Sequence, residues 1–287
     1  MNDIFIKATA FGISSDEWST DHNILPSMLL SVLETWSIKT FDGSENLSKD
    51  ISSDLAREYG KINTAKYGFV SDLHNLAINY SMINRITKDD SLNNGIKSLY
   101  IGLLVENYVT NIRSCYDFTS LFPRFLIDIK SIKRLTSMKN SDSLNTLLKF
   151  CEKEKGENIF SESVYRSLAM VRSDLEDIRN IRDSIIHHGK EPIVHIENNS
   201  LTLRIPKTAP YGKENALPDI LSIGDDNYPL LAYLRELTLR LVNYTEYLGN
   251  ALFDEFRNKD NTYKVFLTAL IGVCIKDFRE YITTPHI

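Results

Sequence analysis

Residues 161–192 have the sequence SESVYRSLAMVRSDLEDIRNIRDSIIHHGKEP, which carries the most informative helical pattern in the chain. Apolar side chains recur there at the three- and four-residue spacing of one buried helix face, namely Val164, Leu168, Val171, Leu175 and Ile178. Ser161 or Ser163 can cap the start of this helix. Gly189 suits the left-handed residue that follows a helix end, and Pro192 blocks continuation. The segment therefore predicts one long amphipathic helix.

The same helical spacing of apolar residues recurs on both sides of this segment. Further helices are expected at about 69–83, 101–115, 124–138, 230–248 and 265–281. Ile193–Glu197 and Leu201–Ile205 alternate around Asn198-Asn199-Ser200, which predicts a small β-hairpin. Residues 206–227 hold three prolines and few periodic signals, so a long loop is expected there.

These patterns predict an all-α fold, in which a helical bundle carries the hairpin at about residues 193–205 as an insertion. Residues 1–62 have mixed patterns and a polar stretch rich in Ser, Asp and Gly, so we expect them to form an N-terminal extension. Residues 63–287 would then form one helical domain. With 287 residues, of which 43% are hydrophobic, the chain is long enough to bury a substantial core.

The charge balance limits how the chain could bind nucleic acid. Its formal net charge is −5, whereas proteins that bind nucleic acid independently of sequence normally have an excess of Lys and Arg. Any such contact must come from a local patch, or from two patches joined by dimerisation. The densest basic cluster comprises Arg124, Lys130, Lys133, Arg134 and Lys139. Both a solvated helix face and an RNA-contact surface are open interpretations of this cluster.

The cysteines and the termini suggest a compartment. The three cysteines are far apart and form no CxxC pair, which suits a reducing environment. The first residues, Met1-Asn2-Asp3-Ile4, lack the basic and apolar regions of a signal peptide. The longest nearly apolar stretch, Val265–Ile275, is too short to span a bilayer. We therefore expect a cytoplasmic protein that does not bind a membrane.

Arg182 stands out because it is charged at a position where an apolar residue is expected. The buried stripe, continued past Ile178, reaches position 182 and then Ile185. A guanidinium stays charged at any relevant pH, so burying it without acidic partners is costly. Arg182 is therefore either paired within the core or faces a cleft in which an anion binds.

His187 lies five residues after Arg182. Asp183 lies four residues before His187, which places it one helical turn back on the same face. A carboxylate at that spacing can orient an imidazole. His187 and His188 both fall in the last turn before Gly189, where the helix dipole favours a protonated imidazole. Histidine is the usual general acid or base near neutral pH.

Other groupings of polar residues are weaker. His187, His188 and His195 could suggest a metal, but adjacent helical residues diverge by about 100° and no Cys or acidic ligand completes a set. We therefore expect neither a metal nor a cofactor. One face of the helix expected at about 101–115 carries Glu106, Arg113 and Asp117. These residues could form a solvated or intra-bundle ion network, or they could reach Arg182.

The run Arg182-Asp183-Ser184-Ile185-Ile186-His187 resembles the hallmark of the HEPN superfamily, which is an Arg, a following polar residue and a His five positions after the Arg. The flanking Ile178-Arg179-Asn180-Ile181 and the His188-Gly189 ending also look like that family. The resemblance extends over the bundle from about residue 65 to 251, and its specific part is about a dozen residues.

The resemblance implies a HEPN helical bundle that dimerises and cleaves RNA internally without a metal. Many members are toxins of toxin–antitoxin or abortive-infection systems against phage. By position, Arg182 would stabilise the scissile phosphate, His187 would transfer protons and Asp183 would be the supporting polar residue. RNA binding would also involve His188, Arg179, Lys130, Lys133 and Arg134. The expected partners are the RNA substrate, a second copy that completes a composite active site, and an antitoxin or other regulator.

The sequence departs from one branch of that family. HEPN toxins that are silenced by adenylylation carry a tyrosine two residues after the histidine, whereas this chain has Gly189 there. That mode of control is therefore not expected. The alternative function is a non-catalytic HEPN-like helical module that uses the same cleft to bind a nucleotide or a partner protein.

Overall fold

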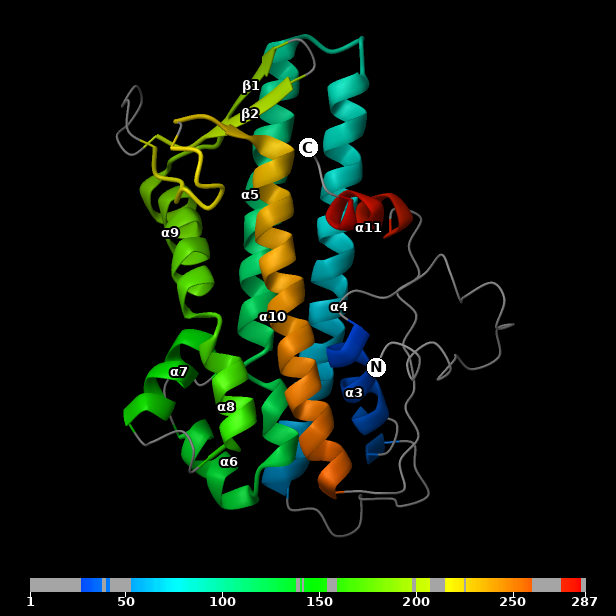
Figure 1. The fold of residues 1–287 in the computed structure, drawn as a ribbon, viewed down its shortest axis with the longest axis vertical. Coiled ribbons are helices and arrows are strands. Elements are labelled where there is room, and N and C mark those ends of the chain that lie inside the picture. Colours follow the sequence, from blue (N-terminus) through cyan, green and yellow to red (C-terminus); the bar gives the residue numbers. More distant parts are fainter. Residues whose placement is uncertain are drawn as a thin grey trace, which may run out of the picture. The chain divides into compact units, whose positions relative to one another are not determined.

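The computed structural model describes residues 27–37, 40–41, 53–137, 140, 142–153, 159–197, 200–206, 215–224, 226–259 and 275–284. Most of these residues are helical, and a small three-stranded antiparallel sheet is the only sheet among them (Figure 1). The predicted mainly helical architecture and the predicted hairpin are thus confirmed. None of the described helices combines the length and the apolar composition that crossing a membrane requires.

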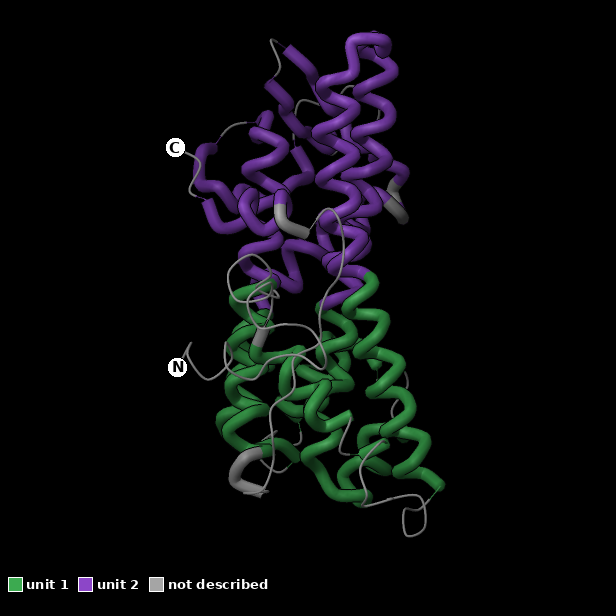
Figure 2. Tube along the Cα trace, turned by 90° about the vertical axis from the view of Figure 1, so that its right-hand side faces the viewer, with its two compact units in different colours: residues 1–71, 116–171, 242–271 green, residues 72–115, 172–241, 272–287 purple. Residues whose placement is uncertain are grey.

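The chain divides into two compact units (Figure 2). Unit 1 comprises the described parts of residues 1–71, 116–171 and 242–271, and unit 2 comprises those of 72–115, 172–241 and 272–287. Both units take residues from three long helices, α4 (Ser53–Lys88), α5 (Asn94–Phe118) and α10 (Leu230–Lys259). The boundary that we expected after residue 62 therefore falls within the continuous helix α4.

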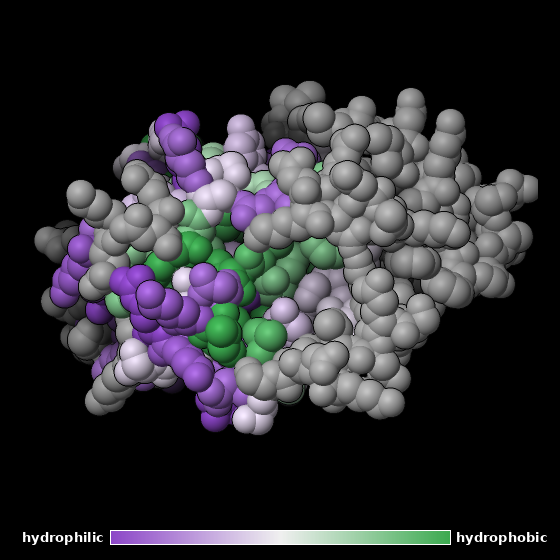
Figure 3. Space-filling view, turned by 90° about the horizontal axis from the view of Figure 1, so that it is seen from below, coloured by the Kyte–Doolittle hydropathy of each residue, from purple (hydrophilic) through white to green (hydrophobic). Residues whose placement is uncertain are grey.

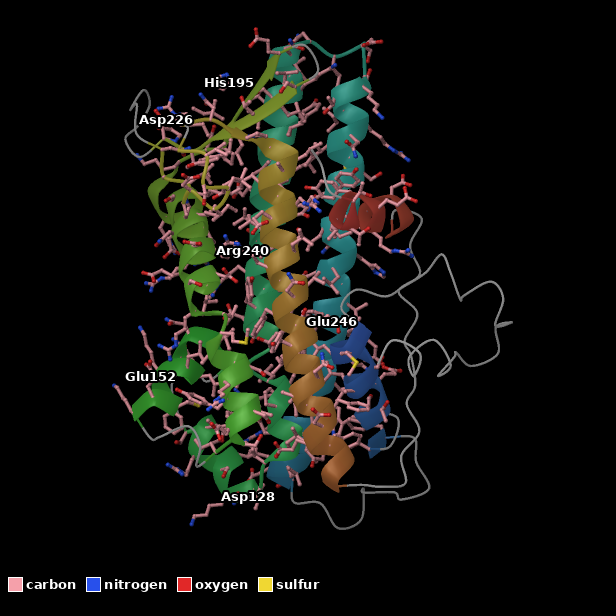
Figure 4. All side chains as sticks on the ribbon, in the orientation of Figure 1. Asp128, Glu152, His195, Asp226, Arg240 and Glu246 are labelled. Carbon is pink, nitrogen blue, oxygen red and sulfur yellow. The ribbon has the colours of Figure 1, made fainter. Side chains whose placement is uncertain are left out.

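Unit 1 adds short helices to its parts of α4, α5 and α10. They are α3 (Ser27–Ser37), the 3₁₀-helix η3 (Phe122–Leu126), α6 (Ile129–Thr136), α7 (Leu144–Lys153) and α8 (Glu162–Ala169). The rings of Trp36 and Phe125 stack with centroids 5.3 Å apart in its core. The Glu246 carboxylate accepts a hydrogen bond from the Met28 backbone N–H at 3.1 Å, so α10 caps the first turn of α3 (Figure 4).

The helix expected at 124–138 is divided. η3 ends at Leu126, and α6 begins only after Asp128, whose carboxylate accepts from the Ser131 N–H at 2.7 Å and caps α6. That hydrogen bond lowers the pKa of Asp128. Arg124 does not belong to the exposed basic cluster, which corrects the sequence-based prediction. Its side chain is fully buried, and Nη1 lies 3.0 Å from the Glu58 carboxylate.

Unit 2 holds α9 (Arg172–His188), the sheet and α11 (Ile275–Thr283), together with its parts of the three long helices. The strands β1 (Ile193–Glu197), β2 (Ser200–Arg204) and β3 (Tyr228–Pro229) lie in that order. Val194 pairs with Leu203, which pairs in turn with Tyr228. The loop predicted at 206–227 thus leads directly into β3, which is too short to produce a period in the sequence.

β1 and the residue before it lie along one face of α5. Ser98 Oγ donates a hydrogen bond to the Val194 carbonyl. A Cβ added at Gly102, one turn further along α5, would lie 3.0 Å from the Pro192 carbonyl oxygen. Gly102 therefore permits a close approach between α5 and the chain that leaves α9.

The helix predicted over residues 161–192 is two helices. α8 ends at Ala169 and α9 begins at Arg172, with a turn at Met170 and Val171 (Figure 1). Val171 remains buried, so the apolar spacing continues through the turn and does not reveal it.

Candidate active site at the end of α9

The buried face of α9 runs through Ile178, Ile181 and Ile185. The stripe therefore passes through Ile181, not Arg182 as expected, because the step after Ile178 is three residues and not four. Arg182 lies beside the buried face, and its side chain is 37% exposed. It is neither enclosed in the core nor fully extended into water.

Arg182, Asp183 and His187 lie together at the C-terminal end of α9. Arg182 Nη1 is 3.1 Å from Asp183 Oδ1 and 3.4 Å from His187 Nε2. His187 Nε2 is in turn 3.8 Å from Asp183 Oδ1. The guanidinium of Arg182 and the imidazole of His187 therefore lie within contact distance of one another. The His187 side chain is 58% exposed, so solvent can reach it.

A second guanidinium completes this cluster. Arg179 Nε lies 3.3 Å from Asp183 Oδ2, one turn before the carboxylate. Asp183 thus contacts two arginines and a histidine, and the four side chains carry at least one net positive charge. Exposed ion pairs of this kind contribute little to stability. The arrangement is better suited to attract and position an anion such as a phosphodiester.

The local sequence explains why the cluster forms at this point. Gly189 has φ +59°, the left-handed conformation that ends a helix without steric cost, and the Lys190 N–H then donates to the Ser184 carbonyl at 3.1 Å. The helix therefore stays regular up to His188, and this keeps Asp183 and His187 one turn apart on it. His188 is helical, but its side chain lies outside the described part of the structure.

The other end of α9 is held by an ion network that sequence reasoning missed. Arg240 projects from α10 toward α9, where Nη1 contacts Asp174 at 3.0 Å and Asp177 at 3.4 Å (Figure 4). Arg240 Nε also contacts Glu236 at 2.9 Å. Burial raises the pKa of both Asp174 and Asp177, although the Arg240 charge opposes this shift. The network fixes the helix that carries the candidate site.

The predicted RNA-contact residues Lys130, Lys133 and Arg134 lie on α6, in unit 1, whereas Arg182 and His187 belong to unit 2. All three are exposed, and Lys133 Nζ lies 3.4 Å from Asp54. Seen from below, the described surface shows hydrophilic side chains beside apolar ones (Figure 3). Lys139, the last member of the predicted cluster, lies outside the described residues.

The remaining polar residues singled out from the sequence have other surroundings. His195 is exposed on β1 (Figure 4). Asp117 accepts a hydrogen bond from the Leu144 N–H at 3.1 Å and so caps α7. Within the described ranges, no group of three His, Cys, Asp or Glu side chains is placed to hold a metal ion.

Unit 2 also contains a cavity of about 460 Å³ at the N-terminus of α10, which no sequence pattern indicated. Its lining comprises Asn84, Thr87, Lys88, Asp90, Leu201, Pro229, Leu230, Leu231 and Ala232. The volume lies within the range of small-molecule sites. None of the predicted site residues lines it.

Comparison of the chain with known protein families, curated proteins and solved structures finds no match.

Proposed function

We propose that the chain is a metal-independent endoribonuclease with a HEPN-like bundle, and that Arg182 and His187 form its active site. The observation that carries this proposal is the 3.4 Å approach of Arg182 Nη1 to His187 Nε2 on an exposed helix end. RNA supplies its own nucleophile, the ribose 2′-OH. To cleave RNA, a protein therefore needs a permanent cation and a proton-transferring group close together.

The reaction would begin with attack of a ribose 2′-OH on the adjacent phosphorus. A base removes the 2′ proton as the bond from O2′ to phosphorus forms, and an acid protonates O5′ as its bond to phosphorus breaks. His187 would perform one of these transfers. Arg182 would stabilise the charge that develops on the phosphorane oxygens. The products would be a 2′,3′-cyclic phosphate and a 5′-OH.

Asp183 would act as a positioning residue. It contacts both Arg182 and His187, so it can hold the two side chains in register before RNA binds. A phosphate oxygen would then replace the Asp183 carboxylate at one face of the guanidinium. Arg179, which shares Asp183, would add positive charge toward the RNA backbone.

A homodimer would supply the second proton-transfer group and double the local positive charge on a chain of net charge −5. The biological setting that fits such an enzyme is a cytoplasmic toxin of a toxin–antitoxin or abortive-infection system, with an antitoxin as its regulator. Lys130, Lys133, Arg134 and His188 would contribute to RNA binding.

The experiment incubates the purified protein with total RNA in the presence and absence of EDTA and then determines the ends of the fragments. We expect cleavage to survive EDTA and to leave 2′,3′-cyclic phosphate ends. Cleavage that disappears in EDTA and returns with a divalent ion would contradict the mechanism, as would 3′-OH ends.

The cavity at the start of α10 favours a second candidate function, a non-catalytic module that binds a nucleotide. Its lining includes Lys88 and Asn84, residue types that can recognise phosphate and base groups. Equilibrium dialysis with ATP and AMP tests this function. Binding that Lys88→Ala removes, in a protein that leaves RNA intact, would favour it over the nuclease.

A further inference from the structure

The chain that leaves α9 brings a further cation to the end of this helix. The Lys190 N–H donates a hydrogen bond to the Ser184 carbonyl at 3.1 Å, and Ser184 directly follows Asp183. The left-handed conformation of Gly189 turns the chain and makes this hydrogen bond possible. The backbone of Lys190 is therefore held against the turn of α9 that carries Asp183, and does not merely follow it in the sequence.

The Lys190 side chain is partly buried, although the neighbouring Gly189 and Glu191 are exposed. Across the described part of the chain, no carboxylate forms an ion pair with the Lys190 ammonium. A lysine can lay its aliphatic stem along the protein and keep its ammonium in water. Because a partly buried stem restricts where the ammonium can lie, Lys190 presents a positioned positive charge to a ligand.

Arg179 presents a positive charge on the opposite side of the Arg182–His187 pair. Its side chain is 58% exposed and contacts Asp183 one turn further along α9. Arg179 and His187 are separated by eight residues, or about 12 Å along a helix. Positive side chains thus follow one another from Arg179 through Arg182 to Lys190, and we call these three residues the cation row.

Acidic side chains lie at both ends of the cation row. Glu176 is exposed one turn before Arg179, and Glu191 is exposed directly after Lys190. Asp183 lies within the row and contacts two of its members. A phosphate beyond either end would meet negative charge, so the row has a defined length. An RNA strand places successive phosphates about one sugar unit apart, and the row therefore accommodates the scissile phosphate and one phosphate on each side.

We propose that Lys190 binds a phosphate next to the scissile one, and that the site takes an RNA strand through three consecutive phosphates. Arg182 binds the scissile phosphate, Arg179 binds the phosphate on one side of it, and Lys190 binds the phosphate on the other side. The inference rests on the proposed function for the cleavage step, whereas phosphate binding by the cation row can be measured without cleavage. A dinucleotide, which has one phosphate between its sugars, would make only one of the three contacts.

Fluorescence anisotropy of the full chain with 2′-O-methyl oligonucleotides of mixed sequence tests this inference, because these probes lack the nucleophilic hydroxyl and are not cut. The probes carry one, three or five phosphates. We expect Kd to fall by at least about tenfold from one phosphate to three, because a hydrogen bond to a charged group contributes roughly that factor. From three phosphates to five, Kd should change by much less. An equal gain for every added phosphate, or no gain at all, would overturn the inference.

Lys190→Gln isolates the contribution of this residue. It should raise Kd for the three-phosphate probe by about tenfold, and should reduce the salt dependence of log Kd by about 0.7, because one phosphate fewer is neutralised. Lys190→Arg keeps the positive charge and should bind like the wild type. Lys149→Gln removes an exposed lysine of α7 and is the matched control. Wild-type binding by Lys190→Gln, or an equal loss in Lys149→Gln, would contradict the role of Lys190.

Cleavage of total RNA by the same proteins separates this inference from the proposed function. A chain that binds three phosphates through Lys190 but leaves RNA intact would support the inference and contradict the nuclease. A chain that cuts RNA, with cleavage and probe binding both unaffected by Lys190→Gln, would do the reverse. A chain that neither cuts RNA nor binds the probes would contradict both.

Discussion

Arg240→Leu should destabilise the fold around the candidate site without touching the site itself. Arg240 contacts Asp174 and Asp177 on α9 and Glu236 on its own helix, and its side chain is only 28% exposed. The substitution leaves Asp174 and Asp177, which are 21% and 28% exposed, without the guanidinium that compensates their burial. Leucine retains the apolar volume of the side chain but offers no hydrogen bond to either carboxylate.

The magnitude follows from this partial burial. Removing one partner of a fully buried pair costs about 3–5 kcal/mol, and partial solvent screening lowers the expected loss to about 2–3 kcal/mol. For a chain of this size that loss corresponds to a fall of roughly 5 °C in melting temperature. Arg85→Leu, at an exposed arginine of α4, is the matched control and should change the melting temperature by much less.

The pH dependence of the loss gives a sharper test. Burial already raises the pKa of Asp174 and Asp177, and losing the Arg240 charge should raise both pKa values further. A carboxyl group whose pKa is higher in the folded than in the unfolded state favours folding as the pH falls through that interval. The difference in free energy of unfolding between wild type and Arg240→Leu should therefore shrink from pH 7 to pH 5. Urea denaturation at both pH values measures it, and a loss below about 0.5 kcal/mol at pH 7 or a larger loss at pH 5 would refute the reasoning.

Two further predictions concern glycines. A Cβ at Gly249 would lie 2.3 Å from the backbone N of Leu29, so Gly249→Ala should lower the free energy of unfolding by about 2–3 kcal/mol in urea denaturation. Gly60 on α4 has open space around its Cβ position, and Gly60→Ala should instead raise it by up to about 1 kcal/mol; the opposite order would contradict the packing of α3 against α10. Gly189→Ala places a Cβ at φ +59° and should cost about 1 kcal/mol, with faster amide hydrogen exchange in the last turn of α9. Unchanged exchange there would show that Gly189 does not hold the end of the helix.

Helices and strands whose apolar residues recur at a regular spacing were predictable from the sequence. The hairpin alternation around Asn198-Asn199-Ser200 led to β1 and β2, because one face of each strand is buried. The four-residue spacing of Asp183 and His187 predicted that these two side chains approach one another, because residues four apart lie on the same helix face. Both inferences need only local geometry.

Features that depend on distant residues were not predictable. Arg124 looked like part of a basic surface, and only the fold brings Glu58, 66 residues away, to its guanidinium. The Arg240 contact with Asp174 spans the same sequence distance. The turn at Met170 was hidden because the apolar spacing continues across it.

The most direct test of the proposed active site compares RNA cleavage by wild type, His187→Ala, Arg182→Ala and His195→Ala at equal concentration. His195 is an exposed histidine on β1 and serves as the matched control. We expect His187→Ala and Arg182→Ala to lose cleavage while their melting temperatures stay close to that of the wild type, because neither side chain lies in the core. His195→Ala should cleave normally. Cleavage at the wild-type rate by His187→Ala would contradict the assignment of the active site.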